Sequence, residues 1–220
     1  MDDNYFNFPI VLLQGFMSDS RKCLYDVFSY CVFDFMQNNS EDEMKEFFGI
    51  SKYNKDRVLQ YGKQLYDSIN NEAFTGLSVS LFWKYYNNTD VTDWNRICLL
   101  AFLAIKSIVG KRPCAKVTNQ NLIYSRMAGF TYIQDTLPEE ILAYCTRRKF
   151  EKIKSDLKYH YNVSFYAYYT RGQYISTQLD FETLCRVAEK QRLTNRTRQQ
   201  KLAEKEARER IRNDPAIMYT

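Results

Sequence analysis

Residue types that usually perform catalysis are sparse and scattered in this chain. His160 is the one histidine among 220 residues, so a histidine-based metal site or proton relay has almost no material. The motifs H-E-x-x-H and G-x-S-x-G and the paired Cys/His spacings of metal sites do not occur. Gly110-Lys111 lacks the upstream Gly and the following Ser or Thr of a phosphate-binding loop. We therefore expect a protein that is not an enzyme and uses no cofactor or metal.

A basic segment between Thr146 and Tyr161 has the residue types for binding a polyanion. At about 100° per residue, Phe150, Ile153 and Leu157 fall on one apolar stripe of a helix. The opposite face and its flanks carry long cations and hydroxyls: Arg147, Arg148, Lys149, Lys152, Ser155, Lys158 and Tyr159. Such a face suits the major groove of DNA, where Arg reads guanine through two hydrogen bonds. The alternative is an ordinary solvated helix surface.

Charge is distributed unevenly along the sequence. Residues 1–100 carry 9 Lys or Arg and 14 Asp or Glu, whereas residues 101–220 carry 22 and 12. Residues 186–213 alone contain ten basic residues against four acidic ones. This asymmetry favours a C-terminal half that binds nucleic acid. The last segment is helix-prone but has few apolar residues, so it is interpreted either as a solvated helix or as an arm that follows phosphates.

The elements of the C-terminal half come in an informative order. A helix apolar on all sides is expected over 93–110, which places it at the centre of a core. Thr118 is expected to cap a helix over 119–128, and Thr136 and Glu139 to form a capping box for a short helix over 137–144. The basic helix follows. Runs typical of strands, 163–169 and 173–179, then meet at a turn that contains Arg171, and Asp180 caps a last helix.

This order resembles a winged helix-turn-helix domain over residues 93–190. The resemblance is carried by the segment K-V-T-N-Q-N-L-I-Y-S-R-M-A-G at 116–129 and by the Arg/Lys-rich helix that leads into a hairpin. It implies that the basic helix enters the major groove, that Arg171 at the wing tip contacts a phosphate or the minor groove, and that Asn119 and Gln120 also contact DNA. Residues 130–145 form an insertion relative to the simplest members.

The first 90 residues are expected to form an acidic helical bundle. Helices are predicted over 20–38, from a capping box at Ser40 to about Gly49, and after Asn54. Glu41, Glu43 and their acidic neighbours could hold a divalent cation, but a helix N-terminus already favours acids. The polar stretch 87–90 is the expected boundary. The prediction is thus a mainly α chain: a bundle over 1–90, a winged-helix-like domain with one hairpin over 91–190, and a basic helical or disordered tail over 191–220.

Localisation and function follow as expectations. The acidic start at Met1-Asp2-Asp3 is unlike a signal peptide, and the longest apolar run, of nine residues, is too short to span a membrane. Six cysteines without a C-x-x-C pair favour reduced thiols over a disulfide framework. We expect a cytoplasmic protein that binds duplex DNA in regulation or replication initiation, with a possible protein partner at the acidic bundle. The alternatives are a protein-interaction module and a binder of RNA or single strands, the latter through the Tyr-rich hairpin.

Overall fold

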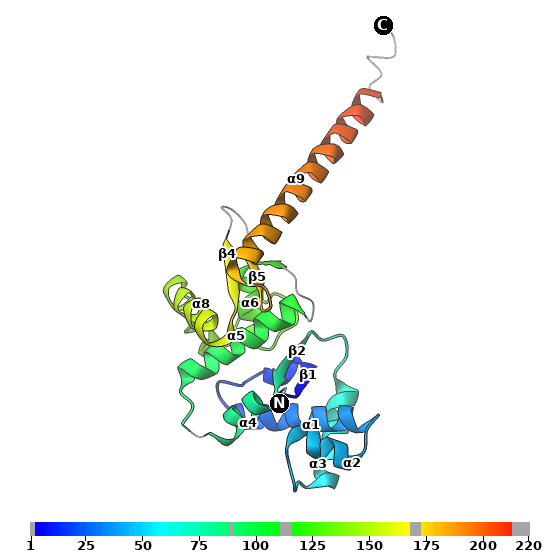
Figure 1. The fold of residues 1–220 in the computed structure, drawn as a ribbon, viewed down its shortest axis with the longest axis vertical. Helices are drawn as coiled ribbons and strands as arrows, with labels where there is room; N and C mark the ends of the chain where they lie inside the picture. The colour runs from blue at the N-terminus through cyan, green and yellow to red at the C-terminus, as the bar shows by residue number, and fades with distance from the viewer. Residues whose placement is uncertain (1–2, 89, 111–115, 168–172, 213–220) are drawn as a thin grey trace.

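The computed structural model describes residues 3–88, 90–110, 116–167 and 173–212, and its fold is mainly α (Figure 1). The region before residue 90 forms the lower part of the molecule in Figure 1. Its elements are β1 (Tyr5–Pro9), a 3-10 turn (Ile10–Leu13), α1 (Ser20–Met36), α2 (Glu41–Phe48), α3 (Lys55–Ser68), β2 (Phe74–Ser78) and α4 (Val79–Asn87).

The region expected to form an acidic helical bundle, residues 1–90, is mainly helical and also contains a two-stranded sheet that was not predicted. β1 pairs antiparallel with β2, and Tyr5 lies opposite Ser78. Within β1, Phe6 and Phe8 are buried in the core while Tyr5 is 41% exposed, the alternation typical of a strand with one buried face. Each strand is short and its partner is distant in the sequence, so local periodicity gave no signal for the pairing.

The region after residue 90 contains the expected succession of helices and a hairpin, with an additional strand. β3 joins the hairpin strand β5, so the sheet has three strands in the order β3-β5-β4. The hairpin itself pairs Tyr166 with Tyr174. The elements are α5 (Asp93–Val109), β3 (Lys116–Thr118), α6 (Gln120–Met127), α7 (Glu139–Leu142), α8 (Arg147–Tyr161), β4 (Ser164–Ala167), β5 (Gln173–Ser176) and α9 (Phe181–Arg212).

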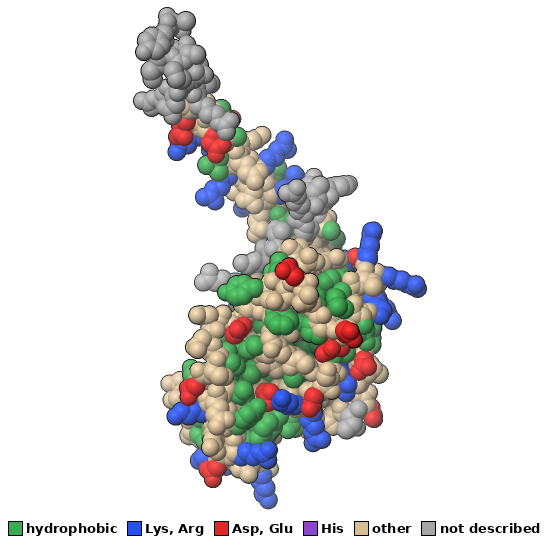
Figure 2. Space-filling model, turned by 180° about the vertical axis from the view of Figure 1, so that it is seen from behind, with side chains coloured by type: hydrophobic (Ala, Val, Ile, Leu, Met, Phe, Trp, Pro, Cys, Tyr) green, Lys and Arg blue, Asp and Glu red, His purple; other side chains and the backbone are tan. Residues whose placement is uncertain are grey.

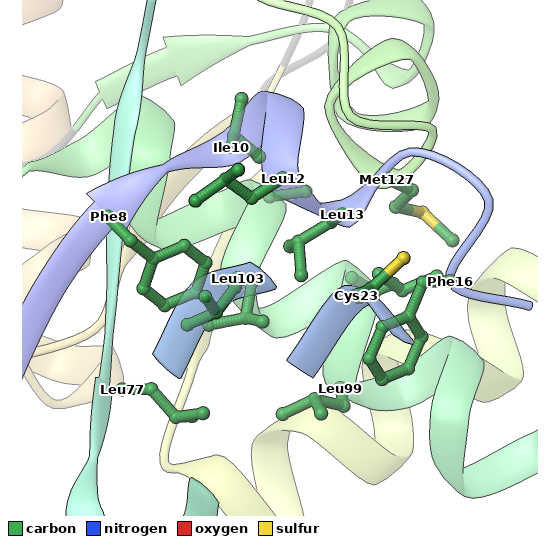
Figure 3. Close-up of a cluster of buried hydrophobic side chains, with 14 of the residues drawn as sticks. Phe8, Ile10, Leu12, Leu13, Phe16, Cys23, Leu77, Leu99, Leu103 and Met127 are labelled. Carbon is green, nitrogen blue, oxygen red and sulfur yellow. The ribbon is translucent and has the colours of Figure 1, made fainter. Parts of the chain in front are cut away.

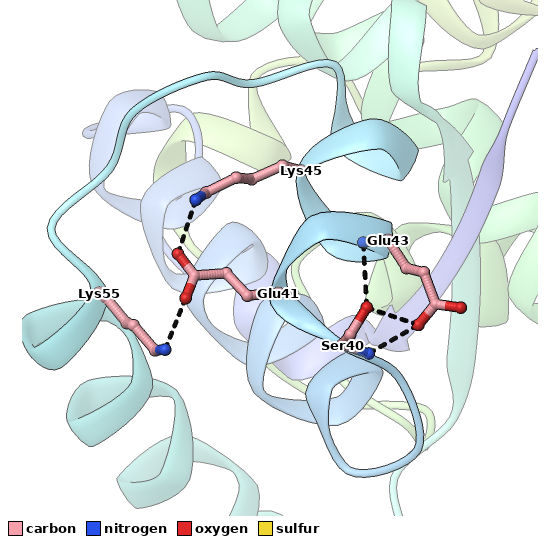
Figure 4. A network of polar contacts seen from close by, with 5 residues as sticks. All are labelled: Ser40, Glu41, Glu43, Lys45 and Lys55. Carbon is pink, nitrogen blue, oxygen red and sulfur yellow. Dashed lines mark hydrogen bonds and ion pairs between the residues drawn. The ribbon is translucent and has the colours of Figure 1, made fainter.

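Helix capping agrees with the sequence at several positions and differs at two. Ser40 and Glu43 form the expected capping box, and Glu41 pairs with both Lys45 and Lys55 (Figure 4). These bonds lower the pKa of the Glu41 carboxyl. Glu41 and Glu43 are thus used in ion pairs and helix capping.

The two differences concern α6 and α7. The cap of α6 is Asn119, whose side chain accepts a hydrogen bond from the Leu122 N–H, while Thr118 belongs to β3. The capping box expected at Thr136 does not form, and Pro138 occupies the N-cap position of α7 without a side-chain bond. Neighbouring polar side chains near a helix start compete to accept hydrogen bonds from the same backbone N–H groups. Because Thr118 belongs to the strand β3, Asn119 caps α6 instead.

One core runs through both halves of the chain. α5 is buried along its middle, as expected for a helix without a polar face, and Ile97, Leu99 and Ile105 have no exposed surface. Phe8 and Leu13 from the N-terminal region pack in the same cluster as residues of α5 and α6 (Figure 3). The predicted boundary near residue 90 therefore does not correspond to a break in the packing. None of the helices in the described part of the chain is long and apolar enough to cross a membrane.

Candidate nucleic-acid interface

The orientation of α8 is fixed by its apolar stripe. Phe150, Ile153 and Leu157 have no exposed surface, in agreement with the predicted wheel. Thr146 caps the helix by accepting a hydrogen bond from the Lys149 N–H at 3.3 Å, and Asn162 ends it in the left-handed conformation. Since the stripe faces α5 and the hairpin, the opposite side of α8 is directed away from the core.

The predicted basic face is exposed along the whole of α8. Its members Arg147, Arg148, Lys149, Lys152, Ser155, Lys158 and Tyr159 are all exposed, and Tyr159 shows 82% of its surface. Figure 2 shows basic side chains projecting from the side of the molecule on which α8 lies. The structure thus brings these seven residues together on one surface.

Three lysines of this face are held near aromatic rings. Lys152 Nζ lies 4.4 Å from the centroid of the Trp94 ring, and Lys149 Nζ lies 4.9 Å from that of Tyr144. Lys149 also donates a hydrogen bond to the carbonyl of Ala143 at 2.5 Å. Lys158 Nζ is 5.9 Å from the Phe181 centroid. A cation on an aromatic face keeps its full charge, so these contacts orient the ammonium groups without neutralising them.

The two acidic residues of α8 are both engaged in local contacts. Glu151 forms an ion pair with Lys154 at 2.7 Å, and the stem of Lys154 is largely buried. Asp156 accepts a 2.5 Å hydrogen bond from the indole N–H of Trp94. Their charges are therefore tied to specific partners and leave the outer face dominated by cations.

A hollow of about 310 Å³ lies beside this face, between α8, β4 and the start of α9. Ser155 and Lys158 of the predicted set line it, together with Lys154 and the ring of Phe165. Lys154 Nζ is 5.8 Å from the Phe165 centroid. Glu151, the ion-pair partner of Lys154, also lines this hollow, so Lys158 and the hydroxyls of Ser155 and Ser164 are the groups there whose chemistry suits a contact with a backbone phosphate.

The remaining predicted residues are not joined to this surface. Asn119 and Gln120 are exposed at the start of α6, and the Asn119 side chain serves as the helix cap at 2.9 Å from the Leu122 nitrogen. Between the described residues, no hydrogen bond or ion pair links either of them to α8. The two helices meet one turn later, where Tyr124 and Phe150 pack edge to face at 5.2 Å. Arg171 lies outside the described residues.

The last helix is anchored by contacts that sequence patterns indicate only weakly. Leu184 and Ala188 of α9 are buried against the sheet. The Tyr166 hydroxyl donates to Glu189 at 2.7 Å, and Arg192 pairs with the same carboxylate at 2.8 Å. Residues 193–207 are exposed, and the helix projects away from the body (Figure 1). The signal for this anchor was the short apolar spacing after Asp180, which does cap the helix.

The remaining titratable and thiol side chains of the described residues form no metal site. No group of three or more His, Cys, Asp or Glu side chains there is arranged to hold a metal. The five described cysteines carry free thiols, and Cys114 lies outside the described residues. No protein-family model, curated protein or solved structure matches the chain.

Proposed function

We propose that this chain is a non-enzymatic protein that binds duplex DNA, with α8 lying in the major groove. The observation that carries the proposal is the exposed face of α8. Six basic or hydrogen-bonding side chains and Tyr159 lie on this face, and none of these seven residues is acidic. The groove is about 12 Å wide and admits a single helix. In this proposal Arg148 and Lys152, which are exposed on α8, face the base edges. Ser155 adds a donor and acceptor at the same surface.

The arrangement of the surrounding elements supports a winged helix-turn-helix. The order α5, α6, α8 and hairpin, with α7 in the insertion, agrees with the order expected from the resemblance. In this proposal α6 precedes the recognition helix, and the strands β4 and β5 belong to the wing. The buried edge-to-face pair of Tyr124 and Phe150 gives α8 a fixed position relative to α6.

The projecting part of α9 supports a second, non-specific contact. Residues 190–203 contain five basic residues and no acidic one, and residues 193–203 are exposed. A helix of this kind next to the sheet can follow the phosphate backbone beyond the segment that α8 reads. We assign the protein to regulation or replication initiation and place it in the cytoplasm as part of the same proposal, with a protein partner at the acidic N-terminal region. The free described thiols accord with that compartment.

A salt series tests this proposal directly. Fluorescence anisotropy with random duplex DNA, single-stranded DNA and RNA measures affinity at several salt concentrations. We expect the duplex to bind best, and log affinity to fall linearly with log salt, with a slope of about −0.9 for each phosphate contacted. A flat salt response, or no duplex binding at low salt, overturns the proposal and favours the protein-interaction module. Tighter binding of RNA or single strands than of duplex favours the third interpretation.

A further inference from the structure

A cavity of about 610 Å³ lies away from α8, at the junction of the two halves of the chain. Its walls come from β1 and β2, from the C-terminal end of α5, from the end of α8 and from the segment between β5 and α9. This volume is within the usual range of pockets that bind small molecules, roughly 300–1,000 Å³. Nothing in the proposed DNA-binding function uses this cavity.

Lys106 is the one charged side chain among the described residues that line the cavity. It lies in the last turn of α5, is half-buried, and donates a hydrogen bond to the Tyr5 hydroxyl. Its ammonium group is 3.9 Å from the Tyr5 ring centroid and 5.2 Å from that of Phe102. In the described part of the chain no carboxylate pairs with it, and burial lowers the pKa of its amine to about 8. A partly desolvated cation without a counter-ion is stabilised when an anion binds beside it.

Aromatic rings form the other main feature of the cavity. Phe102 and Tyr161 pack with their centroids 4.5 Å apart, and Phe74 is a large apolar side chain that remains 52% exposed. Together with Tyr5 these rings offer apolar faces on several sides of the space around Lys106. Such a lining favours a flat aromatic body, because rings stack on rings and shed water in doing so.

Polar groups at the wall are few and uncharged. Asn7, Thr177 and Gln178 line the cavity and carry donors and acceptors that can orient a bound molecule. Gly76 leaves room for this arrangement: a Cβ there would lie 2.4 Å from the Tyr5 ring and 2.7 Å from the Asn7 amide oxygen. Because Gly76 has no side chain, Tyr5 and Asn7 can pack across β2 and reach the cavity.

We infer that this cavity binds a small aromatic anion, with the carboxylate or phosphate group at Lys106 and the ring among Tyr5, Phe74 and Phe102. The charge of Lys106 favours an anionic group. Small inorganic anions should bind poorly, because they would lose their hydration water beside aromatic walls without gaining ring contacts. The inference is independent of the DNA-binding proposal, so either can fail alone.

Isothermal titration calorimetry of the full chain with matched probes tests the inference. To test a carboxylate, 1-naphthoate is compared with its neutral partner 1-naphthamide. To test a phosphate, 1-naphthyl phosphate is compared with its neutral partner 1-naphthol. Acetate and inorganic phosphate serve as anions without a ring. We expect at least one aromatic anion to bind about tenfold or more tightly than its neutral partner and than the anion without a ring. The arm that binds better identifies the anionic group.

Two substitutions locate the site. Lys106→Met should remove most of the preference for the anion, whereas Lys63→Met, an exposed lysine of α3, should leave it unchanged. Phe74→Ala should lower the affinity for the aromatic anion and the affinity for its neutral partner by similar factors. Equal binding of anion and neutral partner to the unaltered chain, or an unchanged preference in Lys106→Met, overturns the inference.

A pH series on the unaltered chain does not depend on any variant folding. Affinity for the aromatic anion should fall between pH 7 and 9 as Lys106 loses its proton, while affinity for 1-naphthamide, which does not titrate in this range, stays constant. Tyr5 and Tyr161 are the other titratable groups in the described lining, and burial raises the pKa of Tyr161 above this range. An affinity for the anion that does not change across this range overturns the inference.

Discussion

The indole N–H of Trp94 donates a 2.5 Å hydrogen bond to the carboxylate of Asp156, which joins the first turn of α5 to the middle of α8. The face of the same ring lies 4.4 Å from the ammonium group of Lys152. One side chain of the central helix thus holds an anion of α8 through its edge and a cation of α8 through its face. The basic face of α8 is therefore positioned by the core helix as well as by its own apolar stripe.

Trp94→Phe should destabilise the protein by about 1–3 kcal/mol, because the half-buried carboxylate of Asp156 loses its indole donor and keeps only the weak Cys98 thiol donor among the described contacts. The substitution removes the N–H together with the five-membered ring of the indole and keeps a benzene ring at this position. The measurement is the free energy of unfolding from urea denaturation, together with duplex affinity, which should fall as α8 loses part of its support.

Trp83→Phe is the matched control for this change. The Trp83 N–H donates at 2.7 Å to the carbonyl of Phe48, so its loss removes a bond between neutral groups, worth about 0.5–1.5 kcal/mol. Trp83 belongs to the N-terminal region, and duplex affinity should not change. Equal effects of the two substitutions on DNA binding would show that Trp94 has no special role in positioning α8.

Arg148→Ala should separate affinity from stability. The side chain is exposed, so the free energy of unfolding should change by no more than about 0.5 kcal/mol. At a preferred DNA site the substitution should weaken binding by about 1–3 kcal/mol, and by much less on random duplex, because an Arg that reads a base contributes to specificity. Anisotropy titrations on selected and random duplexes measure the difference.

Leu157→Ala on the same helix should instead affect stability, because this side chain is in the core. Leu157 has no exposed surface, and its truncation should destabilise the protein by about 2–5 kcal/mol through a cavity in the core. If Arg148→Ala unfolds the chain while Leu157→Ala does not, α8 presents a different face to the core and the proposed interface is wrong.

A chain that ends at Arg192 should test the arm formed by α9. The segment beyond it carries seven basic and four acidic residues, and its described side chains are exposed up to residue 207. Its removal should weaken binding to all duplexes alike and reduce the salt slope, with the melting temperature unchanged. The cut keeps the Arg192–Glu189 pair within α9 and the hydrogen bond from Tyr166 to Glu189, which joins the helix to the hairpin. A collapse of thermal stability would show that the removed segment is packed.

Local patterns predicted α8 well because each of its signals lies within the helix. Phe150, Ile153 and Leu157 share a stripe, and Thr146 precedes them at the cap, so about 16 residues contain all the information needed. The exposure of Arg148 and Lys152 follows from that stripe alone. Whether this face binds DNA stays a prediction, because exposure and charge describe the surface without identifying its ligand.

Pairings between distant segments could not be read in the same way. Tyr5 lies opposite Ser78, and the pairing also brings Tyr5 to Lys106 of α5. The cavity at Lys106 exists because β1, β2, α5 and α8 converge there, and no spacing within any one of them indicates a site. The additional strand β3 is a further example, since three residues are too few to show a period.

Lys106 should also give the protein a distinctive dependence of stability on pH. Burial lowers the pKa of its amine from an ordinary 10.5 to about 8 in the folded chain, so between these values the unfolded chain binds more protons than the folded one. The contribution of Lys106 to the free energy of unfolding is therefore least favourable below pH 8 and improves as the pH rises toward 10.5. Lys106→Met removes this dependence. Buried thiols and phenols titrate at the upper end of the range in both proteins, so the difference between them isolates Lys106. In urea denaturation at pH 7, 8, 9 and 9.5, we expect the variant to be the more stable protein at pH 7 and its advantage to shrink at each step. A constant difference would show that the amine titrates normally in the folded chain and is fully solvated.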